Sequence, residues 1–403
     1  MKKLFVCVLA LVLLCSCATT NKETPIKVPL LEEQIDAVPI ATADMTVDEW
    51  RQICLDYFKL QLEIPWTPDR DFTFQYKTTG VSMSREAGVG YAGLPYVSGA
   101  YGNLYRFMKY YDSKTGVVSV EGEDQEFADL IGNQCSNGAG WAWARVINNT
   151  TFQSTVSMTQ ARGCIKLGPY EYDTSIWEFT STRSICVENG EQIMYQSYAL
   201  WQPADGMVYY HRTGHVQMVA SKPQIVYLEN GEIDGDASTV CIIDQTSKDG
   251  KMTYLQTEQN GELWQQGNTS KEMTFKELFD KGYIPFTFAE FIGEGEFEKS
   301  EVTVSGYTLP ESGVVLSELA QGTVESNYLV SDVRLCFKNK RGKEITTVWC
   351  PIDRAKSYSY SLENAFSDEK IADMAKKKGA TVDIIVRIGT GEKVTIYSGT
   401  FSQ

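Results

Sequence analysis

The sequence predicts an α+β protein with two folded units. Helical spacing of apolar residues marks the first third of the chain, around 46–60 and again from 135. Short alternating runs, separated by Asn-Gly and Asp-Gly turns, then predict strands. An acidic, glycine-containing segment at 294–300 precedes a further set of strands. The chain has 403 residues, which is long enough for two domains.

Residues 1–17 have the features of a bacterial lipoprotein signal. Two lysines follow Met1, and the apolar run at 4–14 is too short to span a bilayer. The sequence LCSC at 14–17 is similar to a lipobox with Cys17 as the lipidated residue. A cleaved signal peptide with incidental cysteines is the alternative. Lipidation of Cys17 would hold the chain on a membrane surface, the outer membrane if the cell has one.

The first predicted unit spans 46–297 and follows a polar segment that contains prolines. Residues 18–45 show no sustained period, so we expect an irregular tether. Thr46 and Glu49 form a capping-box pattern and predict a helix of about four turns that ends before Pro65. A glycine-rich loop at 88–99 would let the backbone lie close to another element.

A second helix is expected to begin at Cys135, and strands follow it. The strands of the first unit are predicted at 193–195, 207–210, 215–220, 224–228 and 239–243, with a short helix at 273–281. Residues 298–403 predict a β-sandwich-like unit with strands at 302–305, 329–338, 344–349, 382–388 and 393–398 and one helix near 368–378.

Composition restricts the partners and cofactors. A net charge of -15 and a pI near 4.8 argue against nucleic acid and against electrostatic attachment to anionic lipid. Seven cysteines follow Cys17, and an odd number in an exported chain leaves at least one thiol unpaired. The sequence leaves open whether Cys336 and Cys350 form a disulfide. No CxxC pair or Cys/His cluster is present, so no metal site and no cofactor are predicted.

One cysteine and one histidine have the surroundings that thiol chemistry requires. Cys135 lies in the polar sequence GNQCSNG at 132–138, at the expected start of a helix. A helix N-terminus and a nearby imidazolium both lower the pKa of a thiol. The only histidines are His211 and His215. We expect Cys135 as nucleophile and His215 as base, with His211 as the alternative base and a buried inert thiol as the alternative for Cys135.

A third residue is expected to orient the imidazole. Asp244 ends an apolar strand that follows His215 in the chain, and a carboxylate there could fix the ring tautomer. Gln245 is a neutral alternative for this role. A structural role for Asp244, capping the turn that follows the strand, also stays open.

Three segments, taken in order, resemble the NlpC-type papain-like peptidases of bacterial cell walls and, more loosely, the CHAP amidases. They are LPYVSG at 94–99, GNQCS at 132–136, and ADGMVY at 204–209 followed by GHVQMV at 214–219. The resemblance covers about residues 46–290. It implies a papain-like domain whose antiparallel sheet packs on the nucleophile helix, with Tyr96, Gln134 and Ser136 at the substrate. Gln134 replaces the usual Asp of the NlpC pattern and is closer to the CHAP pattern.

The resemblance implies a cell-envelope hydrolase that cleaves amide bonds in peptidoglycan stem peptides. The expected partners are peptidoglycan or its peptide fragments, and a membrane through the lipid anchor. The main alternative is a catalytically silent scaffold of the same fold that binds cell-wall or surface glycopeptide. Acyl transfer or ester hydrolysis by the same residues is a further alternative.

Overall fold

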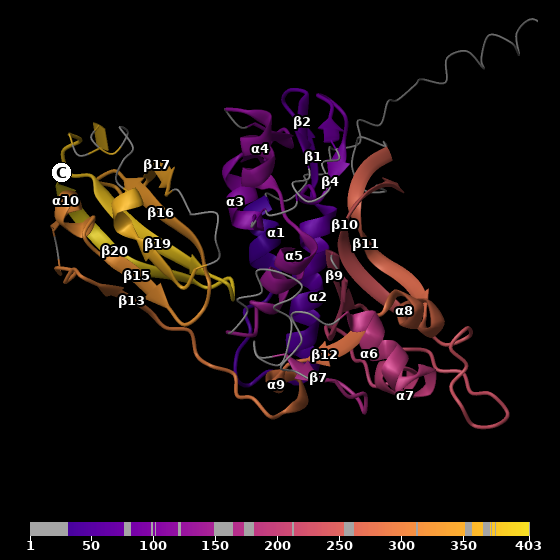
Figure 1. Ribbon diagram of the computed structural model, residues 1–403. Helices are drawn as coiled ribbons and strands as arrows, with labels where there is room; N and C mark the ends of the chain where they lie inside the picture. The colour runs from indigo at the N-terminus through magenta and orange to yellow at the C-terminus, as the bar shows by residue number, and fades with distance from the viewer. Residues whose placement is uncertain are drawn as a thin grey trace, which may run out of the picture.

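The computed structural model describes residues 31–75, 82–97, 100, 102–119, 122–148, 164–172, 181–211, 213–253, 262–311, 313–350, 357–365, 371, 373–374 and 376–402. In these ranges the protein is a mixed α+β structure with several sheets, which confirms the predicted class. Figure 1 shows helices α2 (Val47–Glu63) and α5 (Cys135–Trp143) in the middle of the molecule. The C-terminal strands lie on one side of them, and the long hairpin of β10 (Thr239–Thr253) and β11 (Glu262–Thr274) lies on the other.

The first described element corrects the predicted tether. Leu31–Ala37 form helix α1, in which Leu31 and Ile35 are buried. The prediction of an irregular segment over 18–45 is therefore wrong for this part. Seven residues are too few for a helical period to be evident, and the helix packs against later helices that the segment itself does not reveal. Residues 18–30 lie outside the described ranges, as do Cys17 and the predicted signal.

Helix α2 (Val47–Glu63) confirms the predicted helix and its start. The Thr46 side chain accepts a hydrogen bond from the backbone of Glu49, and the Glu49 carboxylate accepts one from the backbone of Thr46 at 2.7 Å. The helix buries one face along most of its length. It ends before Pro65, where strand β1 (Pro65–Pro68) begins, because proline lacks the N–H that a helix interior needs.

The largest sheet contains ten strands among the described residues, in the order β5-β6-β1-β4-β11-β10-β9-β8-β12-β7. From β11 to β12 neighbouring strands are antiparallel. The strands are β5 (Tyr111–Asp112), β6 (Val117–Val118), β4 (Tyr91–Ala92), β11 (Glu262–Thr274), β10 (Thr239–Thr253), β9 (Thr213–Val219), β8 (Gly206–His211), β12 (Ile284–Thr287) and β7 (Ile165–Lys166). A separate hairpin pairs β2 (Phe72–Gln75) with β3 (Ser82–Arg85).

Several predicted elements of this unit are confirmed and two are wrong. Strands β8, β9 and β10 and helix α8 (Phe275–Lys281) match the predictions. The predicted strand at 193–195 is instead helical, within α7 (Glu191–Tyr198), because Gly190 at φ 82° joins α7 to α6 (Thr182–Asn189) and does not form a hairpin turn. The predicted strand at 224–228 is reduced to isolated bridges. The remaining helices are α3 (Leu104–Lys109), α4 (Asp124–Ile131), α5 (Cys135–Trp143) and α9 (Ala289–Ile292).

The glycine-rich loop makes the close approach that its composition predicts. Gly93 has φ +73°, and a Cβ atom there would lie 2.6 Å from the Cα of Leu62 in α2. Its backbone N–H donates to the carbonyl of Ile64 at 2.8 Å. Only glycine satisfies both the left-handed backbone and this contact. The segment that leads to Tyr96 is thereby fixed against the end of α2.

The C-terminal residues form two sheets around one buried apolar cluster. A five-stranded sheet has the order β14-β20-β19-β16-β17 and a three-stranded sheet the order β13-β15-β18, among the residues described. Their elements are β13 (Val302–Ser305), β14 (Val314–Val315), α10 (Leu316–Leu319), β15 (Thr323–Ser326), β16 (Val330–Lys338), β17 (Glu344–Trp349), β18 (Ser359–Ser361), the 3-10 helix η4 (Leu362–Ala365), β19 (Thr381–Ile388) and β20 (Lys393–Ser402). All five predicted strands are confirmed. Of the predicted helix near 368–378, residues 371, 373 and 374 are helical, 376–378 are not, and the rest lies outside the described ranges.

A disulfide between Cys336 and Cys350 is excluded by the sheet. Both thiols are free. Cys350 lies opposite Val333, to whose carbonyl its N–H donates at 3.0 Å, whereas Cys336 lies opposite Thr347. Side chains alternate between the faces of a strand, so Cys350 points into the apolar core with Val333 and Cys336 points to the other face.

Ion pairs from α1 join the two parts of the chain. Glu32 accepts hydrogen bonds from Arg334 at 3.0 Å and from Arg387 at 2.9 Å. Asp36 accepts from Arg387 at 2.9 Å and from Lys393 at 2.6 Å. Burial opposes ionisation of both carboxyls. Arg334, Lys393 and Arg387 nevertheless hold the pKa of Glu32 below its ordinary value, and Lys393 and Arg387 do the same for Asp36.

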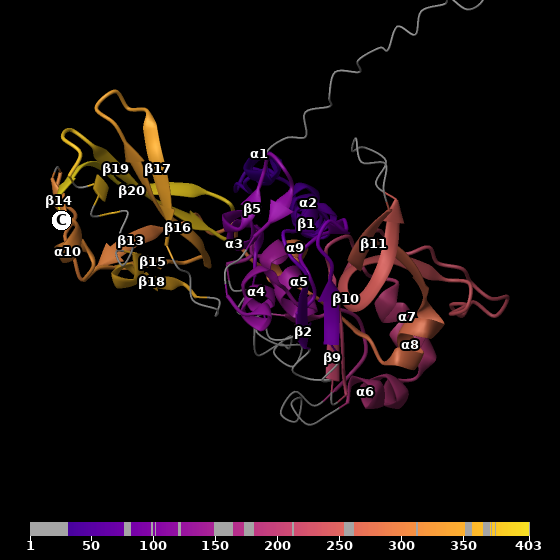
Figure 2. The same cartoon turned by 90° about the horizontal axis from the view of Figure 1, so that it is seen from above.

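A second contact between the parts lies just beyond helix α5. The Tyr328 hydroxyl donates to the carbonyl of Val146 at 3.4 Å, and a Cβ atom on Gly389 would lie 3.1 Å from the Cβ of Ala144. The C-terminal sheets therefore pack against the chain that continues from α5. Figure 2 shows the sheet that contains β16 beside helix α3. No helix within the described ranges is long and apolar enough to cross a bilayer.

Candidate active site

Cys135, His215 and Asp244 come from three different elements and meet beside strands β9 and β10. Cys135 is the first residue of α5, His215 lies in β9, and Asp244 lies in β10. Helix α5 packs against both strands (Figure 1). The structure thus brings together the three residues that the sequence predicts as a catalytic group.

Cys135 lies at the positive end of its helix. Gln134 precedes the helix in an extended conformation, with φ -132° and ψ 166°, and its side chain makes no capping hydrogen bond. Its carbonyl accepts the backbone N–H groups of Asn137 and Gly138 at 3.0 and 2.8 Å. The backbone N–H of Cys135 belongs to the first turn, where N–H groups have no acceptor within the helix and stabilise a nearby negative charge.

Buried amide side chains fix the turn before Cys135. Asn133 donates to the Oε1 atom of Gln61 at 3.1 Å, and Gln61 donates to the carbonyl of Gly138 at 3.0 Å. Asn137 donates to Asn133 and, at 2.8 Å, to the carbonyl of Gly102. All three amides are buried, and a buried amide that lost its partner would not regain one from water. The start of α5 is therefore held from behind by α2 and by the loop before α3.

The strand register explains how His215 reaches Asp244. Strands β9 and β10 pair with Met218 opposite Ile243, and continuing this register by one residue sets Gln217 opposite Asp244. Alternate residues of a strand point to the same face. His215 and Gln217 therefore share the face on which Asp244 lies.

Three side chains donate hydrogen bonds to the carboxylate of Asp244, which is only 3% exposed. Nε2 of His215 lies 2.9 Å and Nε2 of Gln217 lies 3.1 Å from its Oδ2 atom. Nδ2 of Asn268, the residue paired with Asp244 in β11, lies 2.7 Å from Oδ1. Burial opposes ionisation, but His215 and the two amides hold the pKa of Asp244 below its ordinary value.

Cys135 and His215 are hydrogen-bonded, and each shifts the pKa of the other. Burial opposes the thiolate, but the charge of His215 and its hydrogen bond to the sulfur hold the pKa of Cys135 below its ordinary value, with smaller contributions from Val216 and Tyr96. Burial likewise opposes the imidazolium, yet Cys135 and Asp244 raise the pKa of His215 to about 10. Because Nε2 faces Asp244, the ring nitrogen left for the sulfur is Nδ1. Both shifts favour a thiolate on Cys135 beside an imidazolium on His215.

The three predicted substrate residues lie around the sulfur at different depths. The Tyr96 hydroxyl is half-buried and lies 3.9 Å from Sγ of Cys135. A backbone bridge to Asn133 holds Tyr96 beside the nucleophile turn. Gln134 is partly exposed, and Ser136 is buried. Tyr96 and Gln134 can therefore reach a bound molecule, whereas Ser136 faces the interior.

Neither alternative residue occupies a catalytic position. His211 is exposed at the end of β8 and pairs across the hairpin with Thr213. Gln245 is buried and donates to the carbonyl of Leu94 at 2.7 Å, because it follows Asp244 on the strand and points to the opposite face. His215 and Asp244 are thus the pair that the geometry selects.

Most other cysteines of the described part are chemically unlike Cys135. Burial raises the pKa values of Cys54, Cys164 and Cys350, and raises the pKa of Cys186 to about 12. These thiols lie in apolar surroundings and stay protonated. Cys135 is the thiol whose pKa is held low, and the cause is its imidazolium neighbour.

Two aromatic rings lie near His215. Tyr209 lies opposite His215 in the β8–β9 hairpin, and the two ring centroids are 6.5 Å apart. Tyr283 packs edge-on against Tyr209 at 5.2 Å. The side chain of His215 is 17% exposed and Cys135 is 4% exposed, so the pair is sheltered but reachable from one side.

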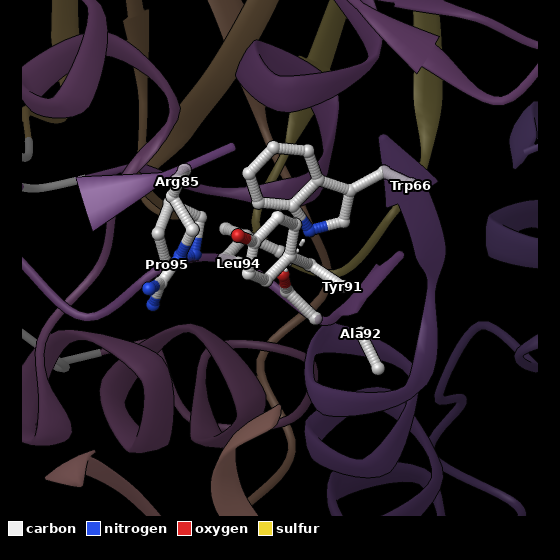
Figure 3. A pocket seen from close by; sticks show the side chains of 7 residues that line it. Trp66, Arg85, Tyr91, Ala92, Leu94 and Pro95 are labelled. Atoms are coloured by element: carbon white, nitrogen blue, oxygen red, sulfur yellow. Dashed lines mark hydrogen bonds between the residues drawn. The ribbon is translucent and has the colours of Figure 1, made fainter. Parts of the chain in front are cut away.

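A separate hollow lies at the other end of the Tyr96 segment. Figure 3 shows Trp66, Arg85 and Tyr91 around it, and Leu94 and Pro95 also line it. The guanidinium of Arg85 lies 4.7 Å from the centre of the Tyr91 ring. None of the three predicted catalytic residues lines this hollow.

Sequence reasoning missed Gln217 and Asn268. Gln217 follows His215 by two residues in an alternating strand, so the period alone places it on the same face and could have indicated it. Asn268 had no such signal, because its position depends on the pairing of β10 with β11 across a register shift between Ile242 and Asp244.

The arrangement can ionise a thiol, hold a protonated base beside it, and keep a carboxylate aligned on that base. Within the described ranges, no cluster of three or more His, Cys, Asp or Glu side chains is placed to hold a metal ion. Comparison of the chain with protein-family models, with curated proteins and with solved structures finds no match.

Proposed function

We propose that the protein is a cysteine hydrolase of the cell envelope that cleaves amide bonds. The observation that carries the proposal is the continuous hydrogen-bonded series from Cys135 through His215 to Asp244. Nucleophilic acyl transfer by a cysteine requires a thiolate, for which a helix N-terminus is a favourable place, and an imidazolium beside it. It also requires a buried carboxylate that holds the imidazolium in place.

The thiolate of Cys135 attacks the amide carbonyl carbon, and a carbon–sulfur bond forms as the carbonyl oxygen becomes an oxyanion. The imidazolium of His215 then donates its proton to the amide nitrogen. The carbon–nitrogen bond breaks and the amine leaves, with the acyl group held as a thioester on Cys135. His215 is now neutral, and Asp244 keeps the ring in the orientation that faces the sulfur.

Water completes the cycle. Neutral His215 accepts a proton from a water molecule as the water oxygen attacks the thioester carbonyl. The carbon–sulfur bond breaks, the carboxylic acid leaves, and the thiolate and imidazolium are restored. Asp244 stabilises the imidazolium before His215 donates its proton to the amide nitrogen, and again after His215 has accepted a proton from water.

The oxyanion requires donors that point to where negative charge develops. The backbone N–H of Cys135 is one, because it lies in the first turn of α5 without an acceptor in the helix. The Tyr96 hydroxyl is the second, since it already lies 3.9 Å from the sulfur. A change of Tyr96 to Phe would remove this donor and keep the ring.

The substrate class rests on the resemblance of the sequence to NlpC-type and CHAP peptidases. We take the first unit as a papain-like domain and the C-terminal sheets as a β-sandwich that packs on it. The substrate is then an amide bond in a peptidoglycan stem peptide. Lipidation at Cys17 would place the protein on a membrane surface next to that substrate.

One observation favours a catalytically silent scaffold instead. Cys135 is only 4% exposed, so a carbonyl carbon must approach through a narrow opening. In that case the same fold would bind cell-wall or surface glycopeptide without cleaving it. The two functions differ in thiol reactivity, because an inert scaffold has no reason to keep a low thiol pKa.

The test combines peptide cleavage with thiol labelling of the full chain. Stem peptides released from peptidoglycan are incubated with the wild type and with Cys135→Ser, and the products are identified by mass spectrometry. We expect new amine and carboxylate ends with the wild type alone. Labelling by iodoacetamide below the ordinary thiol pKa of about 8.5 is expected at Cys135 selectively. Equal cleavage by both proteins, or slow labelling of many cysteines alike, would contradict the proposal.

A further inference from the structure

The two oxygen atoms of the Asp244 carboxylate are used differently. Oδ2 faces Nε2 of His215 at 2.9 Å and also accepts from Gln217 at 3.1 Å. Oδ1 accepts from Asn268 at 2.7 Å. Gln217 lies in β9 and Asn268 lies in β11, the two strands that flank β10. The carboxylate therefore accepts hydrogen bonds from both neighbouring strands.

We propose that Asn268 and Gln217 are positioning residues that fix the carboxylate of Asp244 toward His215. The inference rests on the proposed role of Cys135, His215 and Asp244 and assigns two residues to that site. Neither amide touches the reacting sulfur in this arrangement. Each acts through Asp244, by setting which lone pair meets the imidazole.

The geometry explains why two amides are needed. A carboxylate turns about the bond to its Cβ atom over a broad range of angles, and one hydrogen bond from His215 leaves that rotation open. Asn268 binds the oxygen that His215 does not use, and so fixes the plane of the group. Gln217 donates to Oδ2, the same oxygen that faces His215, and so keeps that oxygen on the face of the sheet where His215 lies.

Burial adds a second reason. Asp244 is 3% exposed and Gln217 is also 3% exposed, so water cannot replace a lost amide readily. Among the residues described, Oε1 of Gln217 is buried without a hydrogen-bond partner. A buried polar atom left unpaired is a cost to the fold that a merely structural glutamine would avoid. The amide is kept for its donor end, which meets Asp244.

Two substitutions at one position separate positioning from general structural support. Asn268→Leu removes the donor, frees the carboxylate to turn, and weakens its pairing with His215. Asn268→Asp keeps the size but places a second carboxyl beside the first, which adds negative charge near the imidazolium. Positioning therefore predicts opposite effects on the pKa of His215. A residue that only supports packing predicts that both variants change it in the same direction.

The readout is the pKa of His215, measured by nuclear magnetic resonance on the full chain. The protein has two histidines, so His211 gives an internal reference in each sample. We expect Asn268→Leu to lower the pKa of His215 by about one unit, the size of one lost hydrogen bond to a charged group. Asn268→Asp should keep that pKa at or above the wild-type value. Ser270→Leu, at an exposed position two residues further along β11, is the matched control and should leave it unchanged.

Iodoacetamide labelling provides the second measurement. Weaker pairing of His215 with Asp244 raises the pKa of Cys135. In Asn268→Leu and in Gln217→Leu, Cys135 should therefore be labelled about tenfold more slowly at any pH below the midpoint of its thiol titration. Wild-type rates in both variants, or a fall in the pKa of His215 in both Asn268 variants, would overturn the inference. Neither measurement needs a substrate. Failure to cleave stem peptides would therefore contradict the proposed function. The positioning role of Asn268 and Gln217 would still be decided by the pKa of His215 and by the labelling rates.

Discussion

Replacing Asp244 with asparagine tests how much of the ion pair depends on the buried carboxylate. Asp244→Asn keeps the shape of the side chain and removes its charge. The pKa of His215, raised to about 10, depends on Asp244 through one hydrogen bond at 2.9 Å and one charge interaction. A hydrogen bond to a charged group contributes about 1.5–3 kcal/mol, which corresponds to roughly one to two pKa units. We expect the pKa of His215 to fall by that amount and to stay raised otherwise, because Cys135 supplies the remaining effect.

The assay is a magnetic resonance titration of the two histidines. His211 is exposed and provides a separate signal as the internal reference. Asp236→Asn, at an exposed site, is the matched control for loss of one negative charge. An unchanged pKa of His215 in Asp244→Asn would refute the reasoning, because it would mean that the carboxylate does not stabilise the imidazolium.

Three further predictions concern stability, each measured by urea unfolding. Gly93→Ala and Gly88→Ala both force a left-handed backbone on alanine, which costs about 1–2 kcal/mol. Only at Gly93 would the added Cβ atom lie 2.6 Å from the α2 backbone, so Gly93→Ala should lose clearly more stability than Gly88→Ala. Arg387→Ala should cost about 2 kcal/mol, less than a fully buried pair, because the two α1 carboxylates that it leaves are 38% exposed; equal stability would contradict the ion-pair account. The raised pKa of His215 stabilises the fold completely below pH 6.5, and this contribution is lost as the pH rises through about 10. The lowered pKa of Cys135 stabilises the fold completely above pH 9.0, and this contribution is lost as the pH falls. The wild type should therefore exceed a Cys135→Ala, His215→Ala double variant in stability by the largest amount between pH 6.5 and pH 9.0. A difference in stability that rises steadily with pH would contradict the proposed pairing of Cys135 with His215.

The residues of the site were predictable to the extent that they depend on local pattern. Cys135 has polar neighbours before a helix, and His215 and Asp244 each belong to a strand whose alternation is evident in the sequence. Alternation fixes the face on which a side chain lies, and thereby also separates Asp244 from Gln245. The sequence alone left Asp244 and Gln245 as alternatives, because the strand pairing that turns one of them toward His215 is set by tertiary packing.

Long-range pairing is where sequence reasoning ended. Asn268 meets Asp244 because β10 and β11 pair with a register shift next to Asp244, and no local signal encodes that register. Helix α1 was missed for a related reason, since its carboxylates are neutralised by cations more than three hundred residues away, Arg387 among them. The run at 193–195 was misassigned because alternation over three residues fits a helix as well as a strand.

The most direct test of the central claim is a titration of the Cys135 thiolate. The ultraviolet absorbance of the thiolate is followed against pH in the wild type and in Cys135→Ser, and the difference isolates one sulfur. The account predicts a midpoint well below the ordinary value of about 8.5, with His215 still protonated at that pH. A midpoint at or above that value, as for the buried thiol of Cys186, would contradict the ion pair on which the proposed hydrolase depends.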